Sequence, residues 1–403
     1  MRQRTCVSAA MFTILVRLGV TLLMVGVAVA DRAHGAEPNA VRLRQLPEGH
    51  IQPMARVDAS GTLHLIYFTG DPVAGDVYYI RRPVDAADFS APLRVNSQSA
   101  SVIAIGTVRG AHLALGTGGR AHVSWMGSDR AEPRGPDGQS PMLYARLGDR
   151  GEFEPQRNLV THAFGLDGGG TVAADTHDRV SVLWHADAGE GGEERRRVWM
   201  TTSIDGGTTF APEVAISEPG VCGCCGMSAA IDRAGTTRAL YRGFAPPDHR
   251  DMFLLRSDGR TLERTRLEGW RLGACPMSTS SISTAAARDD DGDDEGVMTL
   301  AWETAGQVVW ATVDRPTGAV SEPIGPPSPG EHRKHPVVTR AADGRVLFVW
   351  TEGMAWNQGG ILHWQEYDQR RQPTEVHGST GDIPAWSRPA AIAERDGSFT
   401  ILY

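Results

Sequence analysis

Short apolar runs that each end on an aromatic residue recur along the chain at a nearly constant spacing. The runs are "GTLHLIYFTG", "GRAHVSWMGS", "DRVSVLWHAD", "GTTRALYRGF", "GVMTLAWETA", "GRVLFVWTEG" and "GSFTILY". Their aromatic residues are Tyr67, Trp125, Trp184, Tyr241, Trp302, Trp350 and Tyr403, with gaps of 58, 59, 57, 61, 48 and 53 residues. Runs this short, rich in β-branched and aromatic residues, predict strands. We therefore expect seven related units.

Each unit contains the parts of a small antiparallel sheet. One apolar strand precedes the aromatic-ended run, as in "HPVVTRAADG", and another follows it, as in "DVYYIRRP" or "QVVWATVD". Between the first two strands stand Gly61, Gly119, Gly235, Gly344 and Gly397, where tight turns often need a positive φ. Radial repetition of four-stranded antiparallel sheets is the β-propeller architecture. The pattern predicts an all-β propeller of seven blades, with a six-bladed ring as the alternative.

The last unit is short, because only two strands follow Trp386. The segment "AVRLRQL", residues 40–46, has no other partner in the repeat. An open sheet edge exposes unpaired backbone groups. We expect this segment to supply an outer strand of the last blade and to close the ring.

The N-terminus resembles an export signal. A basic start is followed by a 13-residue apolar run, residues 18–30, which ends in "AVA". This combination is typical of a secretory signal peptide, with a retained anchor as the alternative. We expect a signal peptide over 1–30, a linker over 31–39 and a single propeller domain over 40–403. The mature protein is then periplasmic or secreted and has no membrane span.

Net charge limits the partners. The chain has a formal charge of -8 and an isoelectric point near 5.9, which argues against a nucleic-acid partner. We expect a monomer that binds a small molecule or a glycan.

One turn carries a family motif. "SIDGGTTF", residues 203–210, matches the S-x-D-x-G-x-T-[FW] Asp box, or BNR repeat, of the sialidase superfamily. An Asp at this point bonds local amides and stabilises the turn between the third and fourth strands. The chain also resembles secreted bacterial sialidase-like proteins without an assigned activity, which carry a CxCC segment, a later "CP" and an "HP…WTEG" repeat. This resemblance implies a propeller fold over nearly the whole mature chain.

The sialidase resemblance also implies candidate catalytic residues. Sialidases use an arginine triad, an acid/base Asp and a Tyr nucleophile. The candidate residues for these roles are Tyr241, Arg242, Arg250, Asp251 and Arg388, although no clear arginine triad is found. The early R-I-P segment of that family is replaced here by "IQPMARVD". A sialidase-like glycoside hydrolase is therefore one alternative.

Cysteines, methionines and histidines cluster at equivalent places in units four to six. "GVCGCCGMS" begins the first strand of unit four, "ACPMS" that of unit five and "EHRKHP" that of unit six. First strands line a propeller's channel, so their starts face one rim. The candidate metal ligands are Cys222, Cys224, Cys225, Cys275, Met277, His335 and His332.

Soft thiolate and thioether ligands select copper(I) or zinc, and Met277 favours copper with zinc as the alternative. We predict a copper site at the channel mouth, used for redox chemistry or metal handling. A disulfide from Cys275 to one clustered cysteine, in a propeller that only binds a glycan or protein, is a further alternative. The remaining alternatives are a redox-active disulfide and a thiolate nucleophile with His335 as its base.

Overall fold

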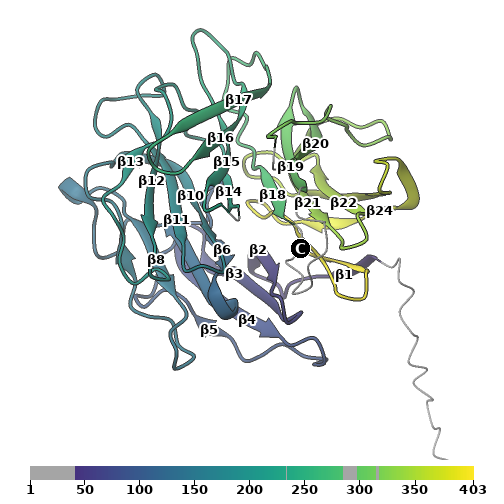
Figure 1. The fold of residues 1–403 in the computed structure, drawn as a ribbon, viewed down its shortest axis with the longest axis horizontal. Helices are drawn as coiled ribbons and strands as arrows, with labels where there is room; N and C mark the ends of the chain where they lie inside the picture. Colours follow the sequence, from purple (N-terminus) through teal and green to yellow (C-terminus); the bar gives the residue numbers. More distant parts are fainter. Residues whose placement is uncertain (1–40, 233, 285–296, 315–316) are drawn as a thin grey trace, which may run out of the picture. The chain divides into compact units, whose positions relative to one another are not determined.

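The strands gather into seven small sheets, which follow one another in chain order (Figure 1). The computed structural model describes residues 41–232, 234–284, 297–314 and 317–403. Contacts group residues 37–403 into one unit. The expected signal peptide, 1–30, and linker, 31–39, lie outside the described residues.

Five blades have four antiparallel strands each, numbered here from the innermost outward. Blade one holds β2 (His50–Val57), β3 (Leu63–Asp71), β4 (Ala74–Arg82) and β5 (Leu93–Arg94); blade two holds β6 (His112–Leu115), β7 (Ala121–Met126), β8 (Met142–Arg146) and β9 (Arg157–Asn158). Blade three holds β10 (Leu166–Ala174), β11 (Val180–Ala186), β12 (Arg197–Ser203) and β13 (Val214–Ala215); blade four holds β14 (Ser228–Ile231), β15 (Thr237–Arg242), β16 (Met252–Ser257) and β17 (Leu262–Glu268). Blade six holds β21 (Arg333–Arg340), β22 (Val346–Glu352), β23 (Gly360–Tyr367) and β24 (Pro373–Ile383).

The other two blades have three strands among the described residues. Blade five consists of β18 (Ser281–Thr284), β19 (Val297–Thr304) and β20 (Gln307–Asp314). Blade seven joins both ends of the chain: β25 (Ala390–Ala393) pairs antiparallel with β26 (Phe399–Leu402), and β1 (Val41–Arg44) pairs parallel with β26. The expected closure and the count of seven blades are thus confirmed, and the six-bladed alternative is not.

The aromatic-ended runs are the second strands of the blades, and their aromatic residues from Tyr67 to Trp350 are buried. Seven buried apolar clusters lie between successive blades. One of them packs Leu65 of blade one against Ile392 and Leu402 of blade seven, which closes the ring. Burial of this apolar surface is the main stabilising term of the ring.

The predicted turns have the expected backbone. Gly61 and Gly344, between the first two strands of their blades, have φ of 84° and 90°. The segment 203–210 lies between β12 and β13. There Asp205 accepts hydrogen bonds from Thr209 N at 2.9 Å and from Ser203 Oγ at 2.7 Å, as expected for a turn held by an Asp side chain.

Helix is limited to two single turns among the described residues, η1 (Thr117–Gly119) and η2 (Pro136–Gly138). In the described part of the chain, no helix has the length and apolar character of a membrane span.

Candidate metal centre

Innermost strands begin with a local distortion that redirects side chains. Gln52 in β2 and His335 in β21 lie in β-bulges and have φ of 55° and 51°. Met277, which precedes β18, has φ of 52°. A bulge turns a residue out of the strand's alternation. The equivalent positions inferred from the sequence thus share a backbone conformation in three blades.

The clustered cysteines occupy the loops before two innermost strands. Cys222, Cys224 and Cys225 lie before β14 and are 1%, 6% and 3% exposed, whereas Cys275 lies before β18 and is exposed. The Cys222 Sγ is 3.3 Å from the Cys224 Sγ and 3.9 Å from the Cys225 Sγ. All four are free thiols.

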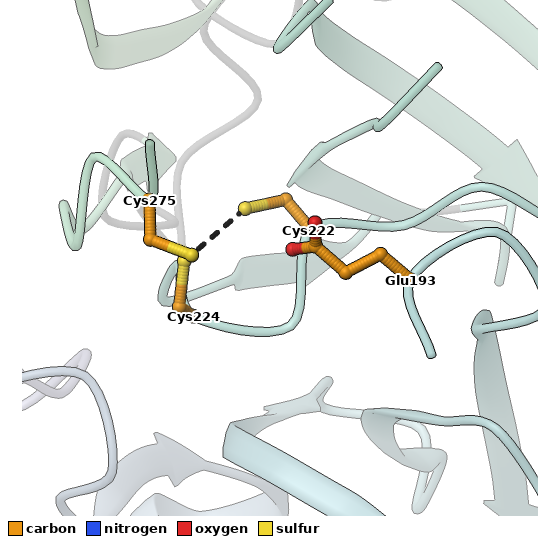
Figure 2. A group of neighbouring side chains, drawn as sticks. All are labelled: Glu193, Cys222, Cys224 and Cys275. Atoms are coloured by element: carbon orange, nitrogen blue, oxygen red, sulfur yellow. Dashed lines mark hydrogen bonds between the residues drawn. The ribbon is translucent and has the colours of Figure 1, made fainter. Parts of the chain in front are cut away.

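Three of these sulfurs converge with one carboxylate (Figure 2). A donor atom from each of Glu193, Cys222, Cys224 and Cys275 lies within 4.8 Å of the other three. Sulfurs bound to one tetrahedral ion, at about 2.3 Å from it, are about 3.8 Å apart, which is close to the spacing here. We call these four residues the thiol cluster. They come from blades three, four and five, rather than from blades four to six as the sequence suggested, and they can hold a metal ion.

Glycines bring the cysteine loop close to blade three. A Cβ added to Gly168 would lie 2.3 Å from the Gly223 carbonyl oxygen, and a Cβ on Gly223 would lie 2.6 Å from the Arg196 Cζ. His185 Nε2 is 3.1 Å from the Cys225 carbonyl oxygen. Backbone of one blade therefore rests directly on backbone of the next, and only glycine leaves room for it.

Arg250 is hydrogen-bonded to a member of the thiol cluster. Its Nη1 donates a hydrogen bond to Glu193 Oε2 at 2.7 Å, and its side chain is 7% exposed. Burial alone would lower the pKa of Arg250, but the neighbouring Cys222 and the hydrogen-bonded Glu193 carboxylate outweigh this effect and raise it. The guanidinium is thus a permanent positive charge beside the sulfurs.

Hydrogen bonds among the packed thiols shift their pKa values in opposite directions. Hydrogen bonding from Cys222 lowers the pKa of Cys275 to about 6. Hydrogen bonds to Cys224 and Cys225 raise the pKa of Cys222. A thiol with a pKa below 7 is a thiolate at neutral pH, and the thiolate is the form that binds metal.

The remaining predicted ligands lie at different distances from the thiol cluster. Met277 packs against the three buried cysteines. His335 is buried with its Nδ1 3.4 Å from Thr279 Oγ1, and burial lowers its pKa to about 3. His332 is exposed. Neither histidine belongs to the group of converging donors found in the described part of the chain.

Tyr241 and Arg242, two of the candidate catalytic residues, follow one another in β15, so their side chains leave opposite faces of the sheet. Tyr241 is buried in the core and stacks on Phe253, with ring centroids 5.5 Å apart. Arg242 donates hydrogen bonds to the carbonyl oxygens of Arg250 and Glu303 at 2.8 and 2.6 Å.

The other candidate catalytic residues have separate partners. Arg250 pairs with Glu193, and Asp251 Oδ2 lies 2.8 Å from Arg266 Nε. Arg388 lines the central channel on blade seven. The candidate residues therefore face different surroundings, and a sialidase-type reaction stays a prediction.

Glu193 is the member of the thiol cluster that sequence reasoning missed. It belongs to "GEGGEERRR", residues 189–197, whose balanced charges are typical of an exposed hairpin. A sequence signal does exist: ten residues connect β11, which ends at Ala186, to β12, which begins at Arg197. A tight hairpin needs only two.

Comparison with known proteins supports the fold. No family model and no curated protein matches the sequence. A protein of unknown function from Dyadobacter fermentans is similar in structure, with a TM-score of 0.51 and 12% identity over 78% of this chain and 93% of that one. A mutant of AofleA from Arthrobotrys oligospora gives 0.50 and 9% over 83% and 88%. The Hadza microbial sialidase Hz136 gives 0.49 and 13% over 86% and 74%. Likeness at this level concerns the propeller fold alone.

Proposed function

We propose that this chain is an exported β-propeller that binds a soft metal ion for metal handling. Copper(I) is the preferred ion and zinc the alternative. The observation that carries the proposal is the convergence of three cysteine sulfurs and a carboxylate within 4.8 Å. Soft thiolates select copper(I) and zinc among the common metals. The thiols come from blades four and five, and the carboxylate comes from blade three.

Copper(I) fits this donor set better than zinc. Three thiolates provide a complete shell for copper(I), and the Met277 thioether packs beside them. Zinc would need a fourth ligand, and the nearest is Glu193. That carboxylate is already hydrogen-bonded to Arg250. Zinc binding therefore remains the alternative that recruits Glu193.

The surroundings suit a metal ion whose thiolate ligands carry more negative charge than the ion neutralises. Three thiolates around one copper(I) ion leave a net charge of two negatives, which the Arg250 guanidinium offsets in part. Burial of Cys222 and Cys224 excludes water, while exposed Cys275 leaves one side of the site accessible. An accessible thiolate gives the metal a route in and out, as metal handling requires.

Metal titration of the full chain tests this proposal. The reduced protein is titrated with copper(I) and, separately, with zinc, each against a competing chelator, and bound metal is counted by elemental analysis. We expect one copper per chain and a loss of at least tenfold in affinity in Cys275→Ser, which alters an exposed side chain and leaves the core intact. Ser60→Ala, at an exposed turn of blade one, is the control for a surface substitution.

Two results would overturn the proposal. One is a wild-type protein that binds neither metal above the level of the Cys275→Ser variant. The other is a free-thiol count, on protein from its export compartment, that finds the cysteines blocked in pairs. The second result would support the disulfide alternative.

A further inference from the structure

The central channel is a second feature, distinct from the thiol cluster. It has a volume of about 1850 Å³ and is lined by the innermost strands of the blades. None of the four thiol-cluster residues lines it. Exposed turn residues such as Ser60, His177 and Arg395 surround its open end.

Two arginines with few partners line this channel. Arg56 belongs to β2 in blade one, and Arg388 precedes β25 in the adjacent blade seven. Arg56 Nη1 donates to the Ala55 carbonyl oxygen at 2.9 Å, and Arg388 Nη2 donates to the Ala111 carbonyl oxygen at 3.3 Å. Arg388 is 6% exposed, and its Nε has no partner within the described residues. A guanidinium has five N–H donors, so most of this capacity is unused.

The carboxylates along the channel are already paired with other residues. The pairs are Asp58–His64, Asp175–Arg179, Asp232–Arg238, Glu394–Arg82, Asp396–Arg42 and Asp343–Arg345. Across the described ranges, no ion pair is formed by Arg56 or Arg388.

These two unpaired charges act on one another and on their surroundings. Burial lowers the pKa of Arg56 to about 10, and burial together with the charge of Arg56 lowers the pKa of Arg388 to about 10. Both guanidinium groups still carry their charge at neutral pH. Holding half-buried Arg56 and buried Arg388, two like charges, beside one another without a counter-charge is unfavourable.

We propose that Arg56 and Arg388 form an anion site, which binds a small oxyanion inside the channel. Carboxylate, phosphate and sulfate each present a pair of oxygens that accepts two parallel hydrogen bonds from a guanidinium. Such a ligand supplies the missing counter-charge and uses the idle N–H donors. The site lies on blades seven and one, so it does not depend on metal binding at blades three to five.

Thermal unfolding of the metal-free full chain tests the anion site. The melting temperature is measured in chloride and then with sulfate, phosphate or acetate at matched ionic strength. We expect an oxyanion to raise the melting temperature above its value in chloride, because a ligand that binds only the folded state stabilises it. Comparison of acetate with phosphate and sulfate shows which oxyanion the site prefers.

Three variants test whether the two arginines cause the rise in melting temperature with oxyanions. We expect Arg388→Met and Arg56→Met each to weaken oxyanion binding at least tenfold and to unfold at a higher temperature than wild type in chloride, because an unpaired charge is removed. Arg388→Lys keeps the charge but not the two-pronged geometry, so it binds with intermediate affinity. Arg395→Met, at the exposed end of the channel, is the control and responds as wild type does.

The proposal is overturned if sulfate, phosphate and acetate all act on wild type as chloride does. It is also overturned if the oxyanion response persists undiminished in both Arg388→Met and Arg56→Met.

Discussion

Arg250 donates a hydrogen bond to Glu193 at 2.7 Å and so links the second hairpin of blade four to that of blade three, beside the thiol cluster. The pair fixes the carboxylate and the cation relative to the Cys222 sulfur. Residues that orient ligands in this way tune a metal site without binding the metal.

Removal of this cation should weaken metal binding. Arg250→Met leaves the thiolate charge uncompensated, so we expect copper(I) affinity to fall by about tenfold. A competition titration measures the change. The control is Arg256→Met, whose guanidinium pairs with Glu263 in an exposed position. Equal affinities in the two variants would show that Arg250 has no part in the site.

Glu193→Gln should separate copper from zinc. Copper(I) bound by three thiolates does not need the carboxylate, so its affinity should change by less than about threefold. Zinc affinity should fall by at least about tenfold, since the amide is a poor substitute for a carboxylate ligand. Parallel titrations with each metal measure both values. A large loss for both metals would make Glu193 a ligand of copper as well.

The backbone contact between blades three and four should fix the position of the loop that carries Cys222 and Cys224. Gly168→Ala would place a methyl group 2.3 Å from the Gly223 carbonyl oxygen, which forces the loop that carries Cys222 and Cys224 to move. We expect weaker copper binding although no ligand is altered. Gly381→Ala, where nothing lies within 4 Å of the new Cβ and φ is not positive, is the control for a glycine change. Wild-type affinity in Gly168→Ala would refute the role of this contact.

The repeats allowed the fold to be predicted from the sequence. The residues of the thiol cluster could be predicted only in part. Each second strand repeats an apolar run that ends on an aromatic residue, and even the closure by residues 40–46 follows from an unpaired edge. The convergence of Cys222, Cys224 and Cys275 follows from their equivalent places in successive blades. Glu193 could not be placed, because the path of a ten-residue connection depends on packing between blades and not on its own composition.

The arginine pair was equally hidden. Arg56 and Arg388 are distant in sequence, and only the ring brings blades one and seven together. Their lack of carboxylate partners depends on how the other channel residues pair. Such information is absent from any local pattern.

Acid should destabilise the protein in part through His122. This residue is 1% exposed, and burial lowers its pKa to about 3. The unfolded chain takes up a proton near pH 6.5 but the native state does not, so stability is present above pH 6.5 and is lost as pH falls toward 3. The loss is about 1.4 kcal/mol per pH unit.

His122→Asn should therefore make the decline of unfolding free energy between pH 6 and 4 shallower, as measured by urea denaturation at each pH. Thr176→Asn, at an exposed residue that does not titrate, is the control. The same slope in wild type and in His122→Asn would contradict the prediction.

Removal of β1 should open blade seven. Val41–Arg44 pairs with Phe399–Leu402, Leu46 N donates to the Tyr403 carbonyl oxygen at 2.7 Å, and Arg42 reaches Ser398 and Asp396. A chain that begins at residue 47 should lose about 3 kcal/mol of unfolding free energy relative to one that begins at residue 37, since each backbone hydrogen bond contributes about 1 kcal/mol. Thermal unfolding measures the loss, and a peptide of residues 37–46 should restore part of it. Identical melting temperatures would refute the prediction.

The pairing of β1 with β26 also has consequences for the folding of the protein and for its aggregation. A chain that emerges N-terminus first must hold β1 unpaired until its last residues are free, so blade seven is the final part to assemble. A copy shortened at either end would keep an exposed sheet edge, the kind of surface on which chains aggregate. Loss of β1 or of β26 should therefore promote aggregation of the damaged copy.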